Sequence, residues 1–175
     1  MVVRSATRTQ LIAPMRQAVA RADEWLISHS IIALRLSVGF VFLLFGVLKF
    51  VPGLSPAESL VQVTLERISF GILGGYPALL SVAVLETVVG LSLLSGRGLR
   101  IGVALLLFAM IGILSPLVVM TGELFTTNPP APTLAAQYVI KDIVLLAAAL
   151  VLLASRGGAS AIASSVGMDD SKPSS

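Results

Sequence analysis

Five ionisable residues fall inside the long apolar stretches of this sequence: Arg35, Lys49, Glu86, Lys141 and Asp142. A charge near the centre of a bilayer costs at least about 2.5–3.5 kcal/mol on insertion scales, so each needs a partner or a wet cavity. Two kinds of chemistry suit such groups. They either form structural ion pairs that fix helix register, or line a polar pocket that binds a ligand head group or passes protons.

The first two of these charges share one face of a helix. Residues of this face recur at spacings of 4, 3, 4 and 3 positions: Arg35, Gly39, Phe42, Gly46 and Lys49. The face is polar at both ends and small between them, and small residues let a neighbouring helix approach closely. We therefore expect it to point into a helix bundle. The expected helix-packing positions are Gly39, Gly46 and, one turn after Glu86, Gly90.

The depth of each charge follows from a helical rise of about 1.5 Å per residue. Glu86 lies near the middle of its apolar stretch, and Lys141 lies about 7 Å from the middle, on the same side as Lys49. We therefore expect Glu86 to pair with Lys141. Arg35 is the second candidate partner of Glu86, and Lys49 is expected to reach Asp142. The five charges sum to +1, which leaves one cation for an anion, a quinone carbonyl or a lipid head group.

The apolar stretches that hold these charges are long enough to cross a bilayer. The chain has 175 residues, of which 56% are hydrophobic and 12% charged, and its mean hydropathy is +0.97. A soluble domain of this size could not bury so much apolar side chain. Backbone amides in lipid must be satisfied within the segment, so helices of about 20 residues are expected. The sequence predicts four membrane helices, at about 31–51, 77–95, 99–120 and 137–154.

The four predicted helices indicate an all-α fold, which is a four-helix membrane bundle over residues 31–154. Residues 1–30 are expected to form a cytoplasmic segment with an interfacial amphipathic helix at 14–28. Residues 155–175 are rich in Gly, Ala and Ser at their start and are expected to form a disordered cytoplasmic tail.

The connections between the spans also carry structural signals. Ser55-Pro56-Ala57-Glu58 has the form of a capping box with proline at the first helical position. It predicts an amphipathic helix at about 56–70, lying on the outer membrane face between the first two spans. Pro116 is expected to kink the third span. Residues 121–136 are expected to form an irregular loop.

Lys and Arg are distributed unevenly between the two ends of the predicted bundle. Nine lie in segments on the side of the termini, and three lie on the other side. The positive-inside rule then places both termini in the cytoplasm. The net charge is only +3, so the basic composition indicates orientation in a membrane rather than nucleic-acid binding.

The chain contains no Cys and a single His, His29. Disulfides, thiolate metal sites, iron–sulfur clusters and CxxC redox chemistry are therefore excluded, and no metal site is expected. His29 is expected to be a polar residue at the entrance of the first span. No nucleotide-binding loop, nucleophile elbow, zinc motif or haem motif is present.

Three segments together resemble the DoxX-like superfamily. RLSVGFVFLLFGVLKFVPG (35–53) looks like its first-helix pattern, and LETVVGLSLLSGRGLRIG (85–102) resembles its second helix, with a Glu, a Gly and a glycine turn. YVIKDIVLLAAAL (138–150) is similar to its last helix. The Lys-Phe-x-Pro ending and the Lys-Asp pair look closest to the branch associated with reactive-chlorine resistance, the YkgB/RclC type. The likeness covers about residues 31–154.

The resemblance implies a protein of the bacterial inner (cytoplasmic) membrane that is tied to redox or oxidative-stress systems. Relatives include a subunit of a thiosulfate:quinone oxidoreductase, and others partner with detoxifying enzymes. The motif positions carried over are Arg35, Gly46, Lys49, Glu86, Gly90, Lys141 and Asp142. This chain departs from members that use cysteine, so a thiol-based activity is not transferred.

Three functions remain open from the sequence. The first, which we expect, is a subunit or scaffold of a redox or stress-response complex, with a quinone or lipid head group as candidate ligand at the charged cluster. The second is a small transporter of a solute or proton, and the third is a quinone-dependent oxidoreductase.

No catalytic residue is assigned, and the chain is not expected to be an enzyme by itself. The expected partners are the bilayer and membrane or redox proteins, without nucleic acid. Gly102 and Gly112 would suit contacts either between protomers of an oligomer or inside the bundle.

Overall fold

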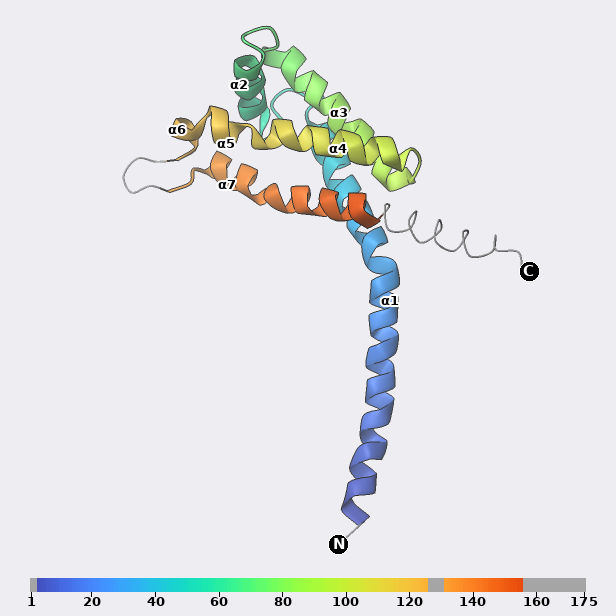
Figure 1. Cartoon of the computed structure of the whole chain (residues 1–175). Coiled ribbons are helices and arrows are strands. Elements are labelled where there is room, and N and C mark those ends of the chain that lie inside the picture. The colour runs from blue at the N-terminus through green and yellow to red at the C-terminus, as the bar shows by residue number, and fades with distance from the viewer. Residues whose placement is uncertain (1–2, 126–130, 156–175) are drawn as a thin grey trace, which may run out of the picture. The chain divides into compact units, whose positions relative to one another are not determined.

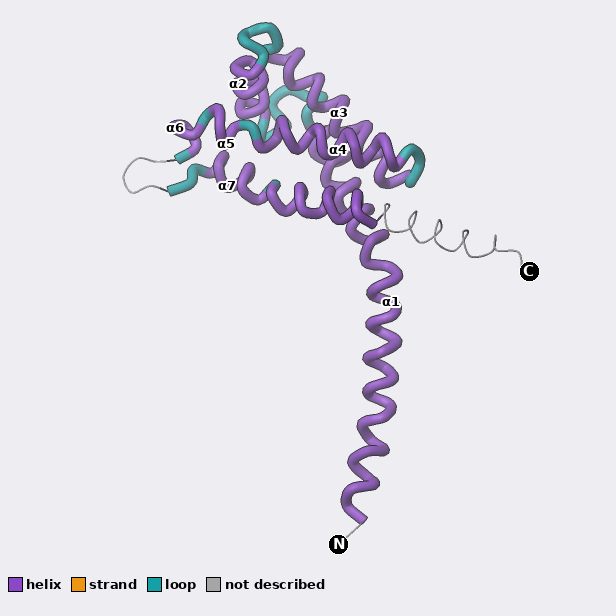
Figure 2. The backbone as a smooth tube through the Cα atoms, in the orientation of Figure 1, coloured by secondary structure: helices purple, strands orange, loops and turns teal. Residues whose placement is uncertain are grey.

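The computed structural model describes the backbone of residues 3–125 and 131–155. Figure 2 shows helix throughout this part of the chain, with short connections. Four helices within it are long and apolar enough to cross a membrane: His29–Leu48, Gly75–Ser95, Leu99–Val119 and Leu134–Ser155. The predicted all-α fold with four membrane-length helices and an amphipathic helix between the first two is confirmed.

The helices follow one another in a simple order along the chain (Figure 1). They are α1 (Val3–Leu48), α2 (Glu58–Ile68), α3 (Gly75–Ser95), α4 (Leu99–Leu114), α5 (Pro116–Val119), α6 (Thr121–Leu124) and α7 (Leu134–Lys141). After a single turn residue, helix resumes over residues 143–155. The chain divides into two compact units, residues up to Leu34 and residues from Arg35 onward.

The first unit is the N-terminal part of α1. Its Trp25 and His29 rings stack with centroids 4.7 Å apart, and His29 Nδ1 lies 2.9 Å from the carbonyl oxygen of Trp25. The interfacial position of residues 14–28 stays a prediction; the segment is helical as part of α1, which runs unbroken from Val3 to Leu48. The physical reason is that no glycine or proline occurs between residues 15 and 38 to end the helix.

The second unit is packed around α3, which lies beside α4 (Figure 1). One side of α3 is fully buried, as shown by Ala78, Leu79, Ala83, Val89 and Leu93, each 0% exposed. A tight turn joins α3 to α4, with Gly96 at φ 73° and Gly98 at φ 62°. Glycine adopts this left-handed backbone without steric cost, so two membrane-length helices can reverse direction over three residues.

The third span is interrupted at Pro116, the residue at which the sequence predicts a kink. Pro116 has no N–H and therefore removes one helical hydrogen bond. The helix accordingly divides into α4 and α5, with Ser115 between them. Hydrogen bonds resume from Val119 N–H to the carbonyl of Ser115, at 3.0 Å, so the chain continues in nearly the same path.

At one end of the second unit, α2 covers the ends of the later helices. Leu60 and Val63 pack against a buried cluster of Met120, Leu124 and Ala136. This contact requires an apolar face on α2, which the helical spacing of its Leu and Val residues supplies. The amphipathic helix therefore uses its apolar face against the protein itself.

The start of α2 differs from the predicted capping box. The helix begins at Glu58 rather than at residue 56, and no side chain caps its N-terminus. The Ser55 hydroxyl is buried without a hydrogen-bond partner. The Glu58 carboxylate instead accepts a hydrogen bond from Gly53 N–H at 2.6 Å. Glu58 thus fixes the loop before the helix, which draws it away from the capping position.

The segment expected as an irregular loop at 121–136 is partly ordered. It contains α6, a β-bridge between Phe125 and Pro132, and the start of α7, where Thr133 accepts a hydrogen bond from Ala136 N–H. Residues 126–130 lie outside the described residues, as does the predicted disordered tail beyond residue 155.

Candidate functional site

A buried ion pair joins Lys49 to Glu86 inside the second unit. The distance from Lys49 Nζ to Glu86 Oε2 is 2.6 Å, and the two side chains are 4% and 7% exposed. Glu86 lies near the middle of α3, and Lys49 is the first residue after α1. In so apolar a setting each charge depends on the other, because removing one partner leaves an uncompensated buried charge.

The Lys49 ammonium also serves the end of α1. The last carbonyl groups of a helix lack intrahelical partners, and these ones lie against α3 rather than in water. Lys49 Nζ donates to the carbonyl of Phe45 at 3.3 Å, and Tyr76 Oη donates to the carbonyl of Phe50 at 3.0 Å. A cation is favourable at a helix C-terminus. α1 ends at Leu48, three residues before the predicted end of the first span at about residue 51.

Three glycines named from the sequence lie at the closest approaches of α1 and α3. A Cβ atom added at Gly39, Gly46 or Gly90 would lie 2.9, 2.8 or 2.5 Å from atoms of the facing helix. Larger side chains would force the two helices apart. These contacts hold the register that places Lys49 against Glu86.

The predicted pairing of Glu86 with Lys141 is wrong, because Glu86 bonds to Lys49 instead. Lys141 is exposed, and its Nζ lies 5.9 Å from the centre of the Tyr138 ring. The buried face of α7 contains Val139, and Lys141 lies two positions further, about 200° around the helix. The depth calculation carried no information on the direction in which each helix faces.

Asp142 lies near the pair without bonding to it. It is half-buried and interacts electrostatically with both Lys49 and Glu86, yet it forms no ion pair with the described residues. The expected approach of Lys49 to Asp142 is therefore a longer-range interaction. Lys49, Glu86 and Asp142, which we call the charged cluster, contain two carboxylates and one ammonium.

Arg35, the second candidate partner of Glu86, lies elsewhere. A Cβ atom added at Gly96 would lie 3.2 Å from Arg35 Nη1, which places Arg35 at the α3–α4 turn. Gly96 is ten residues beyond Glu86, or about 15 Å along the helix. The five ionisable residues identified in the apolar stretches thus separate into the charged cluster, an exposed Lys141 and a distant Arg35.

The two other glycines have different surroundings. Gly102 is buried against the side chain of Ser92, so it serves the contact of α4 with α3. Gly112 is exposed and has open space where a Cβ would lie. Only Gly112 is therefore accessible for a contact outside the bundle.

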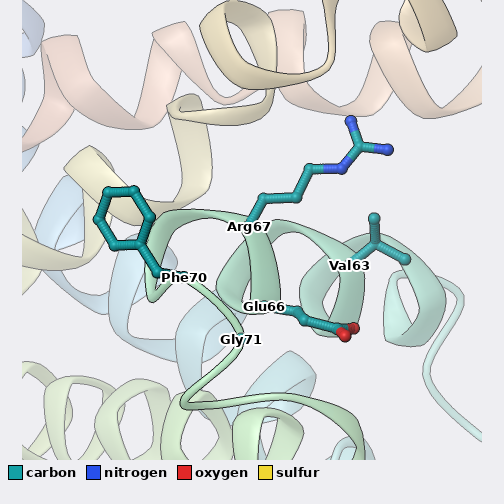
Figure 3. Close-up of a pocket in the computed structure, with 5 residues that line it drawn as sticks. All are labelled: Val63, Glu66, Arg67, Phe70 and Gly71. Carbon is teal, nitrogen blue, oxygen red and sulfur yellow. The ribbon is translucent and has the colours of Figure 1, made fainter.

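An open depression of about 490 Å³ lies at the end of α2, away from the residues named from the sequence. It is lined by Val63, Glu66, Arg67, Phe70 and Gly71, and Figure 3 shows Arg67 and Glu66 leaving α2 in different directions. Arg67 pairs with Glu123 of α6. The polar groups that line this depression do not converge, so we assign no ligand to the depression. The left-handed Phe70, at φ 55°, is the feature of this turn that periodicity could not predict.

The described residues contain no group of His, Asp and Glu side chains that could hold a metal ion.

Comparison of the chain with curated proteins and with solved structures finds no match. The family model described as DoxX matches residues 30–122, from the first span to α6, and this stretch contains Arg35, Lys49 and Glu86. The matched stretch is more than half of the chain, so this integral, multi-pass membrane protein belongs to the DoxX family.

Proposed function

We propose that this DoxX protein is a subunit or scaffold of a redox or oxidative-stress-response system in the bacterial inner membrane. The observation that carries the proposal is the buried Lys49–Glu86 ion pair, in which each charge is satisfied by the other. Such a pair favours one arrangement of α1 and α3 over others. A fixed helix arrangement is what a scaffold presents to its partners, and the resemblance to DoxX relatives of redox systems supports the proposed redox context.

The proposed location follows from the charge distribution. Nine Lys and Arg residues lie on the side of the two termini and three on the other side, which supports a cytoplasmic N-terminus and C-terminus. A reporter enzyme fused to the C-terminus and active only outside the cytoplasm would contradict this orientation.

A quinone or lipid head group is the proposed ligand at Lys141, which precedes Asp142 of the charged cluster in the chain. Lys141 supports it, because its ammonium is exposed next to the Tyr138 ring and makes no ion pair with the described residues. An ammonium can donate to a quinone carbonyl or a phosphate oxygen. The closer likeness to the reactive-chlorine-resistance branch is part of the same proposal.

A small proton or solute transporter is the second candidate, and one observation favours it. Asp142 lies where helix stops after Lys141 and resumes at residue 143, close to Lys49 and Glu86. Ionisable residues at interruptions of membrane helices are typical of transport pathways.

Purification of the full chain in mild detergent from bacterial membranes tests these alternatives. We expect an oxidoreductase or a detoxifying enzyme to copurify, and its activity in membranes to fall when the chain is deleted. Extracted quinones are measured in the same preparation. The chain purified alone, with proton or solute flux in liposomes that is lost in Asp142→Asn, would support the transporter instead.

Matched variants connect this experiment to the ion pair. Glu86→Gln and Glu123→Gln remove the same charge from a buried and an exposed position. The proposal predicts that Glu86→Gln reduces copurification of the enzyme and Glu123→Gln does not. If both variants retain the partner and its activity fully, the Lys49–Glu86 pair does not support a scaffold.

A further inference from the structure

The guanidinium of Arg35 lies at the end of the second unit formed by the α3–α4 turn. α1 and α3 meet in antiparallel order, with Gly39 against Leu93 and Arg35 against Gly96. The turn joins two membrane-length helices, so it lies at a membrane surface and not at mid-depth. Arg35 is therefore at the depth of lipid head groups, closer to the surface than its place within an apolar stretch suggests.

Arg35 has no partner for its charge among the described residues. Its Nε is buried and makes no hydrogen bond, and its guanidinium forms no ion pair in this part of the chain. A guanidinium stays protonated in proteins. A buried donor without an acceptor is unfavourable, so an acceptor from outside the chain would stabilise this arrangement.

Two further arginines lie at this end of the helices, Arg97 on the turn and Arg100 at the second position of α4. Arg97 and Arg100 are exposed, and hydrogen bonds fix the backbone between α3 and α4. Ser92 Oγ donates to the carbonyl of Arg97 at 3.0 Å, and Ser95 Oγ accepts from Arg97 N–H at 3.3 Å. The backbone that carries Arg97 is thus fixed directly after Gly96.

The residues of α3 and α4 on either side of the turn carry no negative charge close to it along the chain. No Asp or Glu occurs from Thr87 to Gly122. α4 begins after Gly98 without a side-chain cap, so its first N–H groups add positive potential at the same turn. Exposed apolar side chains flank the cations, among them Leu91 and Ile101.

We propose that Arg35, Arg97 and Arg100 bind the phosphate group of an anionic phospholipid in the leaflet next to the α3–α4 turn. Guanidinium groups match phosphate oxygens in geometry and charge. Free phosphate offers the same oxygens, but the apolar side chains beside the cations suit acyl chains, which only a lipid provides. The site is separate from the charged cluster and does not depend on the proposed redox role.

Native mass spectrometry of the purified full chain in detergent, with added phosphatidylglycerol or phosphatidylcholine, tests the proposal. The wild-type protein is expected to retain phosphatidylglycerol in preference to phosphatidylcholine. The double variant Arg97→Gln, Arg100→Gln is expected to bind phosphatidylglycerol about tenfold more weakly, because each basic residue near a membrane contributes to anionic-lipid affinity. Arg35→Gln is expected to weaken binding as well.

The controls separate the site from general charge effects. Arg67→Gln removes an exposed arginine of α2 that pairs with Glu123, and it is expected to leave binding unchanged. The double variant alters only exposed residues at and just after the turn, so it tests the site even if Arg35→Gln does not fold. Equal binding of phosphatidylglycerol by the wild type and the double variant would overturn the proposal, as would equal binding of the two lipids by the wild type. Displacement of phosphatidylglycerol by inorganic phosphate would assign the site to free phosphate and overturn the lipid assignment, whereas retention supports it.

Discussion

Within the described ranges 3–125 and 131–155, two ion pairs join distant parts of the chain, and they differ in their access to solvent. Lys49 and Glu86 are 4% and 7% exposed in their side chains, whereas Arg67 and Glu123 are 42% and 53% exposed. Water or ions can replace a lost partner in the exposed pair, which contributes about 0–1 kcal/mol in proteins generally. Losing one partner of a buried pair costs about 3–5 kcal/mol. Burial, and not bond length, therefore decides which pair organises the fold.

The two pairs also differ in what surrounds them. Lys49 additionally donates to the Phe45 carbonyl at the end of α1, and the glycine contacts of α1 with α3 fix its position. Arg67 and Glu123 lie on exposed faces of α2 and α6. The contact of those helices rests on apolar packing around Leu124. The buried pair is thus part of the helix packing, and the exposed pair is an addition to it.

The largest expected effect comes from removing one buried charge. Glu86→Gln leaves the Lys49 ammonium without its bonded counter-ion, so the free energy of unfolding should fall by about 3–5 kcal/mol. Titration of the protein in mixed detergent micelles, followed by the loss of helical signal, measures the change. An unaltered unfolding midpoint would contradict the structural role of the pair.

A smaller loss is expected where the helices approach most closely. Gly90→Ala places a Cβ 2.5 Å from the backbone of Leu43, and such overpacking typically costs about 1–3 kcal/mol. Gly112→Ala is the matched control, because nothing lies within 4 Å of its added Cβ. The same micelle titration should show Gly112→Ala at or slightly above wild-type stability. Equal losses of stability in both variants would show that the close approach of α1 and α3 does not account for the effect of Gly90→Ala.

The smallest effect is expected at the exposed pair. Arg67→Met or Glu123→Gln should lower the free energy of unfolding by about 0–1 kcal/mol, because water screens these charges. The difference from wild type should shrink further as salt is added. A loss as large as that of Glu86→Gln would show that exposure does not separate the two pairs.

The four spans could be predicted from the sequence, because their hydropathy exceeds anything a soluble helix of that length needs. The glycine face of the first span could be named from its spacing. The partner of Glu86 could not, since depth along a helix does not give the direction in which Lys141 faces. α1 ends at Leu48, three residues before the predicted end of the first span, because the prediction included Phe50 and Val51, which are apolar but follow the end of the helix.

A double-mutant cycle on Lys49 and Glu86 tests the central claim most directly. Lys49→Met, Glu86→Leu and the double variant are compared with wild type by unfolding in mixed micelles. We predict that the double variant is more stable than the two single losses imply, with a coupling free energy of about 2 kcal/mol or more. Additive losses, within about 0.5 kcal/mol, would contradict the claim that this pair holds the end of α1 against α3.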